Sequence, residues 1–336
     1  MKVDSAENGH RPIGFRLAAS RQSIANCRQP IGRQPIAVSG MTLIETLVVV
    51  AIIVILIGLL LPAIQTIRQT SQRAQCANQL RQIGLACHAY HDAFGTLPPG
   101  YCAEPSADPL ATSPGWGWAS HLLPYLDQSE LSRQLDLTQA IEVAANGARL
   151  NVVSIFLCPA DSPLPLSFSI TDVNGREVAD AAPISYAGCY GSAELDEIPG
   201  PKEGVFYRNS QIRLSDITDG TSTTIMIGDR AWSHAMAPWA GAVNGGIVRG
   251  GPRNAWRFSA DAAYPAPNFC CVQANAINST NDPDGSLDEF FSQHSGGVNI
   301  VFADGGARFV HQHIHPAVLL ALGTRAGGEV VNEADY

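Results

Sequence analysis

An almost wholly apolar run extends from Leu43 to Leu61, LIETLVVVAIIVILIGLLL, and its one charged residue is Glu45. As a helix this run would be about 28 Å long, which matches the hydrocarbon core of a bilayer. The alternatives are a buried core helix and a signal segment, but signal segments usually have apolar cores of only about 7–15 residues. The run therefore predicts one membrane-spanning helix.

Glu45 lies near the start of that run. A carboxylate inside a membrane is costly unless it is paired or close to the interface. Its position therefore indicates a functional role for this carboxylate, and the alternative is a side chain that simply reaches the membrane edge.

A second pattern follows the apolar run directly. From Pro62 to Phe94 the apolar residues recur mostly every three or four positions, with Gln and Arg side chains between them. This period is typical of an amphipathic helix. Pro62 would bend the helix without ending it, whereas GTLPPG at 95–100 would end it. We expect one continuous helix over residues 42–94, about 50 residues long.

The remainder of the chain has short apolar runs separated by Gly, Pro, Asn and Asp. This texture favours an antiparallel, β-rich α+β domain over residues 96–336. A helical region is expected from Ser120, interrupted at Pro124, and a short helix is expected to end near Gly323. The expected strands are NVVSIFLCPAD, ISYAGCYG, GVFY, TTIMIGD and the hairpin VNIVFADGGARFV.

Charge is unevenly distributed along the sequence. Residues 1–40 carry a net charge of +4, so the remainder of the chain carries −13 of the total of −9. The first 40 residues have no sustained periodicity and are interpreted as a disordered cytoplasmic leader. The acidic remainder argues against binding to nucleic acid.

Motifs of common enzymes and metal sites are missing from the sequence. Its eight cysteines show no C-x-x-C pair and no zinc-type Cys/His spacing. There is also no G-x-S-x-G elbow, H-E-x-x-H helix, Walker A loop or G-x-G-x-x-G turn. We expect neither catalysis nor a resident cofactor or metal.

The segment SGMTLIETLVVVAIIVILIGLLLPAIQ resembles the prepilin-type cleavage and methylation signal of type IV pilin-like and pseudopilin-like proteins. The resemblance is carried by Gly40 before the apolar helix, Glu45 five residues later, and Pro62 near its far end. It implies cleavage between Gly40 and Met41 by a prepilin peptidase, and N-methylation of the new terminus. It further implies that Glu45 neutralises the terminal amine of a neighbouring pilin-like subunit. Met41 departs from the pattern, which usually has Phe there.

A longer resemblance covers residues 41–336. The landmarks are QCANQLRQIGLACHAYHDAFGTLPPG, FLCPAD, ISYAGCYG, ITDGTSTTIMIGD and HSGGVNIVFADGGARFV. In this order they resemble the DUF1559 family, which is abundant in planctomycete-type bacteria and joins a prepilin-type signal to a larger domain. The last landmark matches the family's closing pattern of a His, nine residues and Asp-Gly, here His294 and Asp304-Gly305. The family has no known function, so the resemblance implies architecture and localisation more than activity.

His294 and Asp304 could act together as a general base or as metal ligands. The six residues 298–303 would form a strand about 20 Å long, which would hold the two apart. The alternative is that Asp304-Gly305 makes a turn and His294 bonds a nearby loop.

Two lesser metal candidates remain. His311, His313 and His315 would share one face of an extended strand and could hold a borderline metal, although such triplets also occur as solvated faces. Asp216 and Asp219 form a carboxylate-rich turn that could bind calcium, the ion used by pseudopilins as a class, or make a plain Asx turn.

Cys76 and Cys158 both lie within family landmarks. In an oxidising compartment a disulfide between them, tying the long helix to the domain, is the preferred pairing. Two buried free thiols are the alternative.

These observations predict a single-pass protein of the inner (cytoplasmic) membrane, with a cytoplasmic N-terminus and a periplasmic or extracellular domain. Its segments would be a cleaved leader over 1–40, a pilin-like helix over 41–95 and an α+β domain over 96–336. The expected role is structural or in assembly, with a prepilin peptidase/N-methylase and other pilin-like subunits as partners. The alternatives are a membrane-tethered binding module and a tethered hydrolase that uses His294 or the carboxylate turns.

Overall fold

The fold is that of a computed structural model. It describes residues 41–106, 110–161, 165–192, 203–252, 264–279, 286–332 and 336. The predicted leader and Gly40 lie outside the described residues. The chain divides into two compact units between Ile57 and Gly58.

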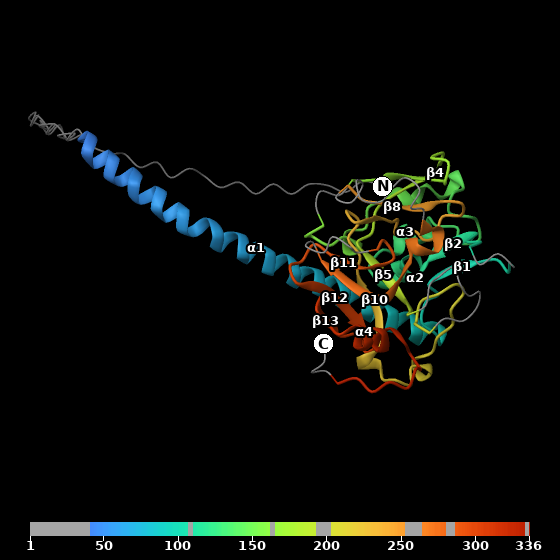
Figure 1. Cartoon of the computed structure of the whole chain (residues 1–336). Helices are drawn as coiled ribbons and strands as arrows, with labels where there is room; N and C mark the ends of the chain where they lie inside the picture. The colour runs from blue at the N-terminus through green and yellow to red at the C-terminus, as the bar shows by residue number, and fades with distance from the viewer. Residues whose placement is uncertain are drawn as a thin grey trace, which may run out of the picture. The chain divides into compact units, whose positions relative to one another are not determined.

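The elements are short except for the first helix (Figure 1). The α-helices are α1 (Leu43–Phe94), α2 (Trp118–Leu122), α3 (Ser129–Arg133) and α4 (Pro316–Gly323). The 3-10 helices are η1 (Leu123–Tyr125), η2 (Ala144–Leu150), η3 (Ser154–Phe156), η4 (Leu214–Asp216), η5 (Thr221–Thr223) and η6 (Ala266–Phe269). The strands are β1 (Tyr101–Ala103), β2 (Pro114–Gly117), β3 (Phe168–Thr171), β4 (Glu177–Ala181), β5 (Tyr186–Gly191), β6 (Ile225–Asp229), β7 (Ala235–Met236), β8 (Ile247–Gly250), β9 (Tyr264–Pro265), β10 (Cys271–Ser279), β11 (Glu289–Ser292), β12 (Gly297–Phe302) and β13 (Ala307–His311).

Helix α1 is 52 residues long and runs through Pro62 without interruption, as the sequence predicts. Its start is capped by a reciprocal pair of contacts. The Thr42 amide donates to Glu45 Oε2 at 2.8 Å, and the Glu45 amide donates to Thr42 Oγ1 at 3.3 Å. This is a capping box, which satisfies amides that the first helical turn leaves without partners.

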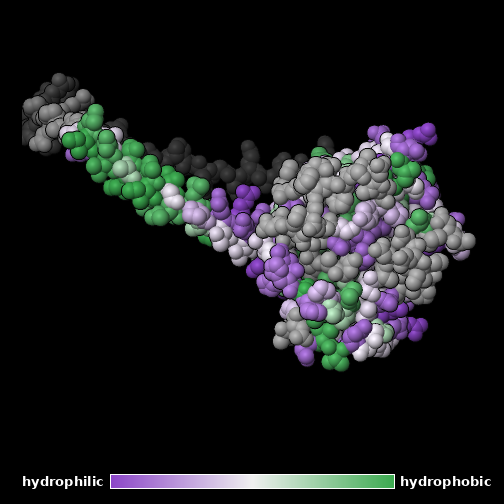
Figure 2. Space-filling model, viewed as in Figure 1, coloured by the Kyte–Doolittle hydropathy of each residue, from purple (hydrophilic) through white to green (hydrophobic). Residues whose placement is uncertain are grey.

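The first part of α1 has the composition of a membrane span and is not covered by protein. Its most apolar stretch is as apolar as a membrane span requires, and none of it is buried. Leu43 is 80% exposed, and Ile53, near the middle, is 48% exposed. Figure 2 shows apolar side chains along this part of the helix. The structure thus contains one described helix able to cross a membrane by length and composition.

The last part of α1 packs on the domain. The buried residues of this helix are Cys76, Leu80, Ile83, Gly84, Ala86 and Cys87. The contact face differs from the predicted one at its edges, because Ala74 and Phe94 are exposed while Gln72 and Gln79 face the domain. The Gln72 amide donates to Pro159 O at 3.0 Å, and the Gln79 amide donates to Ser154 O at 3.1 Å. Glutamine can lie on a packed face when its amide finds a backbone partner.

Within the described residues the main sheet has six strands in the order β11-β10-β5-β6-β12-β13. The pairs β5–β6, β6–β12 and β12–β13 are antiparallel, which confirms the predicted α+β class. The pairs β5–β10 and β10–β11 are parallel, a feature the sequence did not indicate.

The sheet separates two hydrophobic clusters. The larger includes Tyr186 and Val301 together with Leu80 and Ile83 of α1, so α1 covers this face. The smaller includes Ala187 and the α4 residues Leu319 and Leu322, which cover the other face. Neighbouring residues of one strand face opposite clusters because side chains alternate along a strand.

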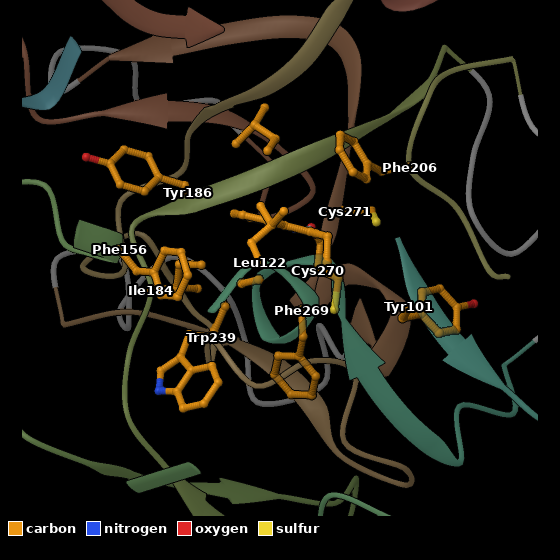
Figure 3. Packing of buried hydrophobic residues seen from close by; sticks show 14 of the residues in the cluster. Tyr101, Leu122, Phe156, Ile184, Tyr186, Phe206, Trp239, Phe269, Cys270 and Cys271 are labelled. Atoms are coloured by element: carbon orange, nitrogen blue, oxygen red, sulfur yellow. The ribbon is translucent and has the colours of Figure 1, made fainter. Parts of the chain in front are cut away.

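Aromatic side chains fill the larger cluster (Figure 3). The Phe156 and Trp239 rings stack with centroids 6.3 Å apart, and Trp118 meets Phe156 edge-on at 6.0 Å. Such arrangements suit the charge distribution of aromatic rings.

Four predicted elements have the expected form. The strands in ISYAGCYG and TTIMIGD are β5 and β6, and VNIVFADGGARFV is the hairpin of β12 and β13. The predicted short helix is α4, which ends at Gly323.

Two predicted strands are wrong. NVVSIFLCPAD contains the 3-10 helix η3, because the amides of Phe156 and Leu157 bond locally to the carbonyls of Val153 and Ser154. In GVFY the described backbone forms no named strand.

Candidate functional site

Four buried side chains from distant parts of the sequence meet beside the sheet. They are Cys76, Cys158, Asp229 and His294, and we call them the buried cluster. One donor atom from each, two sulfurs, a carboxylate oxygen and an imidazole nitrogen, lies within 4.8 Å of every other. Cys76 Sγ lies 3.0 Å from Asp229 Oδ1, and Cys158 Sγ lies 3.3 Å from His294 Nε2.

The docked face of α1 delivers Cys76. The flanking residues Gln72 and Gln79 bond the backbone of the segment that carries Cys158. Cys158 lies two residues after the end of η3 and precedes Pro159. The contacts between helix and segment therefore bring the two sulfurs together.

Sheet pairing delivers the carboxylate. Asp229 is the last residue of β6 and lies opposite Tyr186 of β5. Asn299 of the neighbouring strand β12 fixes one carboxylate oxygen, because its amide and its side-chain NH2 donate to Asp229 Oδ2 at 2.7 and 3.0 Å. The other oxygen, Oδ1, faces Cys76.

His294 lies in the turn between β11 and β12. Ser292 holds this turn, because its hydroxyl accepts from the His294 amide at 2.9 Å and donates to Gly297 O at 2.6 Å. The imidazole Nε2 then lies 4.0 Å from Asp229 Oδ2 as well as beside Cys158.

Tyr186 completes the surroundings of Cys76. Its hydroxyl lies 3.2 Å from the sulfur and donates to Gln79 Oε1 at 2.9 Å. A tyrosine hydroxyl can also turn its hydrogen toward a neighbouring acceptor. The helix, the sheet and the buried cluster are thereby joined in one polar network.

Burial controls the charges in this network. Desolvation raises the pKa of Cys76 and raises the pKa of Asp229 to about 7, despite the hydrogen bonds from Asn299. Desolvation, reinforced by the positive charge of Arg73, lowers the pKa of His294 to about 4. The imidazole is therefore neutral at pH 7, which is the form that ligates metals.

Two kinds of chemistry use such groups. A thiol beside an imidazole can be a nucleophile, but Cys158 and His294 are each only 5% exposed, so a substrate has no access to either in this structure. Two thiols, an imidazole and a carboxylate are also ligands of the zinc type. The geometry favours ligation over catalysis.

The predicted disulfide pair lies inside the buried cluster. Cys76 and Cys158 are both free cysteines here, and their sulfurs lie within 4.8 Å of each other. The pairing stays a prediction.

His294 and Asp304, the two parts of the closing motif, lie in different places in the fold. His294 joins the buried cluster, while Asp304 bonds within the β12–β13 turn. Its carboxylate accepts from the Gly306 amide at 2.7 Å and from Arg308 Nη2 at 2.8 Å. Gly305 has a φ of +79°, which glycine adopts readily. The turn interpretation of Asp304-Gly305 therefore describes the structure.

The three alternating histidines do not share a strand. Strand β13 ends at His311, His313 lies in the following turn, and His315 caps α4 by accepting from the Ala317 amide at 3.3 Å. The prediction of one extended face was wrong, because Pro316 starts a helix directly after the triplet.

The carboxylates of the predicted calcium turn, Asp216 and Asp219, already accept hydrogen bonds from backbone amides. Asp216 accepts from the Arg213 amide at 2.9 Å. The Asp219 oxygens accept from the amides of Gly327 and Gly328 at 2.7 and 2.9 Å. These bonds fasten the loop after α4, which is a structural role for Asp219.

A pocket of about 550 Å³ lies near the same loop, lined by Ser192, Glu203, Leu320, Thr324, Arg325, Ala326, Gly327 and Glu329. Its polar side chains bond one another, as Ser192 donates to Glu203 and Thr324 donates to Glu329. It brings together no set of reactive groups comparable to the buried cluster.

Sequence reasoning missed Asp229 and paired the other cluster members differently. It linked Cys76 with Cys158 as a disulfide and weighed His294 against Asp304. One signal was available, because Asp229 ends the apolar strand TTIMIGD, where an acidic residue is unusual unless it has partners.

Comparison with known proteins gives one family match. A family model described as a protein of unknown function (DUF1559) matches residues 65–317, which include the whole buried cluster. No curated protein and no solved structure matches the chain.

Proposed function

The chain belongs to the DUF1559 family of proteins of unknown function, and from that premise we propose that it is a membrane-anchored, pilin-like envelope protein with a structural or assembly role. The observation that carries the proposal is the division of α1. The helix is continuous, yet its first part exposes only apolar side chains apart from the capped terminus, and its last part is docked on a β-rich domain. A pilin-like subunit combines these two features.

The proposed orientation places the N-terminus in the cytoplasm and the domain in the periplasm or outside the cell. Positive residues concentrate before the span, and short positive flanks stay cytoplasmic. The prepilin-type signal around Gly40 supports the same orientation, because its proposed processing enzyme, a prepilin peptidase/N-methylase, acts at the inner membrane. No catalytic step belongs to the proposal.

Glu45 is proposed to pair with the terminal amine of a neighbouring subunit. In the structure its carboxylate serves the capping box with Thr42. Without the Glu45 carboxylate, the helix would lose only about 0.5–1 kcal/mol of stability, because the Thr42 side chain still caps its first turn. A large effect of Glu45→Ala on assembly would therefore report on pairing between subunits.

The first experiment determines the mature N-terminus by mass spectrometry of the protein isolated from membranes. We expect cleavage after Gly40 and a methylated Met41. An intact first residue, or cleavage elsewhere, would remove pilin-type processing and leave only the anchor.

The second experiment compares Glu45→Ala with Thr46→Ala, a neighbouring exposed position on the same turn. We expect both variants to stay in the membrane, and only Glu45→Ala to lose cross-linked multimers. Normal cross-linking of Glu45→Ala would instead favour a single tether for a binding module.

A further inference from the structure

We propose that the buried cluster binds one structural zinc ion, which fastens the docked part of α1 to the sheet. The proposal concerns the docked part of α1 and the domain on which it packs, and it does not depend on pilin-type processing. Its basis is the convergence of four ligand groups at one buried point, although they are separated by at least 65 residues from one to the next along the chain.

The spacing of the donor atoms fits a tetrahedral ion. With zinc bonds of about 2.3 Å to sulfur and about 2.0–2.2 Å to nitrogen or oxygen, donors at tetrahedral angles lie roughly 3.3–3.8 Å apart. Cys76 Sγ lies 3.0 Å from Asp229 Oδ1 and Cys158 Sγ lies 3.3 Å from His294 Nε2, at or just below the lower end of that range, and one ligand atom from each of the four side chains lies within 4.8 Å of every other. Shifts of less than 1 Å in side chains would complete the geometry.

The donor set selects the metal and its role. Two thiolates disfavour magnesium and calcium, and the imidazole and carboxylate match zinc in a four-ligand site. All four side chains are buried, so the protein fills each position and leaves none for water or substrate. Closed sites of this kind are structural rather than catalytic.

Ligation changes the protons of the network in a balanced way. Zinc binding replaces the S–H hydrogens of Cys76 and Cys158 and any proton on the Asp229 carboxyl, and each displaced proton passes to solvent. Asp229 Oδ1, which accepts from the Cys76 thiol without metal, then becomes a ligand itself. No oxidant or reductant is needed.

The surrounding residues already hold the ligands. Asn299 occupies Asp229 Oδ2 and directs Oδ1 into the cluster. Ser292 fixes the turn that carries His294, and the Tyr186 hydroxyl lies beside the Cys76 sulfur. Partners that orient the ligands in this way are a regular part of metal sites.

The mechanical consequence follows from the origin of each ligand. Cys76 comes from the helix that contains the membrane-spanning run, whereas the other three come from the domain. A bound ion would link helix and domain at one point, and its binding energy would add to the stability of the folded state.

The test uses the full-length chain purified in detergent under reducing conditions, reconstituted with Zn²⁺, dialysed, and assayed for bound zinc. The variants are Cys76→Ala, Cys158→Ala and His294→Ala. The matched control is Cys87→Ala, since Cys87 is also buried in α1 but lies outside the cluster. We expect one zinc per chain in the parent and the control, and at least a tenfold loss of affinity in each cluster variant.

Cobalt substitution tests the metal site in the parent protein itself, so its result does not depend on whether a variant folds. Co²⁺ in the site should give tetrahedral ligand-field bands and thiolate charge-transfer absorption. Three outcomes overturn the proposal: no zinc in the parent, equal zinc in Cys76→Ala and Cys87→Ala, or a Cys76–Cys158 cross-linked peptide in protein isolated from membranes without reductant.

Discussion

The two ends of α1 belong to one helix but differ in composition and in burial. Around Ile53 the side chains are apolar on every side and none of the span is buried. Around Leu80 the sequence is polar on average, yet Leu80 and Ile83 are fully buried. The first end needs an apolar solvent, whereas the second needs a specific partner surface.

The difference shows that apolar content alone does not identify a packed helix. An unbroken apolar surface indicates lipid or other apolar helices, since water-exposed patches of this size promote association. A narrow apolar stripe with glutamines at its edge indicates a docked helix. Four pairs of substitutions test this comparison, and they are given in order of decreasing effect.

The largest effect is expected from Val50→Arg combined with Ile53→Arg. Each arginine near the centre of a span raises the free energy of membrane insertion by about 2.5–3.5 kcal/mol, so the pair should raise it by about 5–7 kcal/mol. Membrane retention, measured by alkaline extraction, should be lost. The matched pair Gln75→Arg and Gln82→Arg, at exposed positions of the docked part, should leave it unchanged. Retention of the first variant would mean that this run does not span the membrane.

Leu80→Ala should lower the free energy of unfolding by about 2–5 kcal/mol, because it opens a cavity where the side chain is fully buried. Leu85→Ala is the control in the same helix, 62% exposed, and should change it by no more than about 0.5 kcal/mol. Denaturant unfolding in detergent measures both. Equal effects would show that α1 is not docked on this face.

Gly84→Ala should destabilise the domain by about 1–3 kcal/mol through overpacking. An added Cβ would lie 2.7 Å from Val301 Cγ2 and 3.2 Å from Gly305 Cα. Gly58→Ala should have the opposite sign and stabilise by up to about 1 kcal/mol, because nothing lies within 4 Å and alanine favours a helix. Thermal unfolding of the two variants decides the sign, and a stabilised Gly84→Ala protein would contradict the close approach of α1 and the β12–β13 turn.

Gln79→Ala should have the smallest effect, a loss of about 1 kcal/mol, because it removes the bonds to Ser154 O and from the Tyr186 hydroxyl. Gln82→Ala, at an exposed position one turn later, should change stability by less than about 0.5 kcal/mol. The same denaturant series measures both. If the two variants matched, the polar contacts of the docked face would contribute nothing net.

Part of the candidate site was within reach of the sequence. Cys76, Cys158 and His294 stood out from their motifs, and the sequence predicted contact between the two cysteines. Asp229 carried only one local signal, an acidic residue at the end of an apolar strand, and nothing in the sequence indicated its partners. Only the pairing of β5, β6 and β12 brings Asp229 to Tyr186 and Asn299.

Sequence patterns were enough to predict the long helix, its change of character after Leu61, the hairpin around Asp304 and the α+β class. These follow from local properties: periodicity, turn chemistry and the length of an apolar run. The tertiary structure alone decided which face of α1 is buried, which strands pair in parallel and which four side chains meet. Those outcomes depend on contacts between residues far apart in the chain, and no local pattern encodes them.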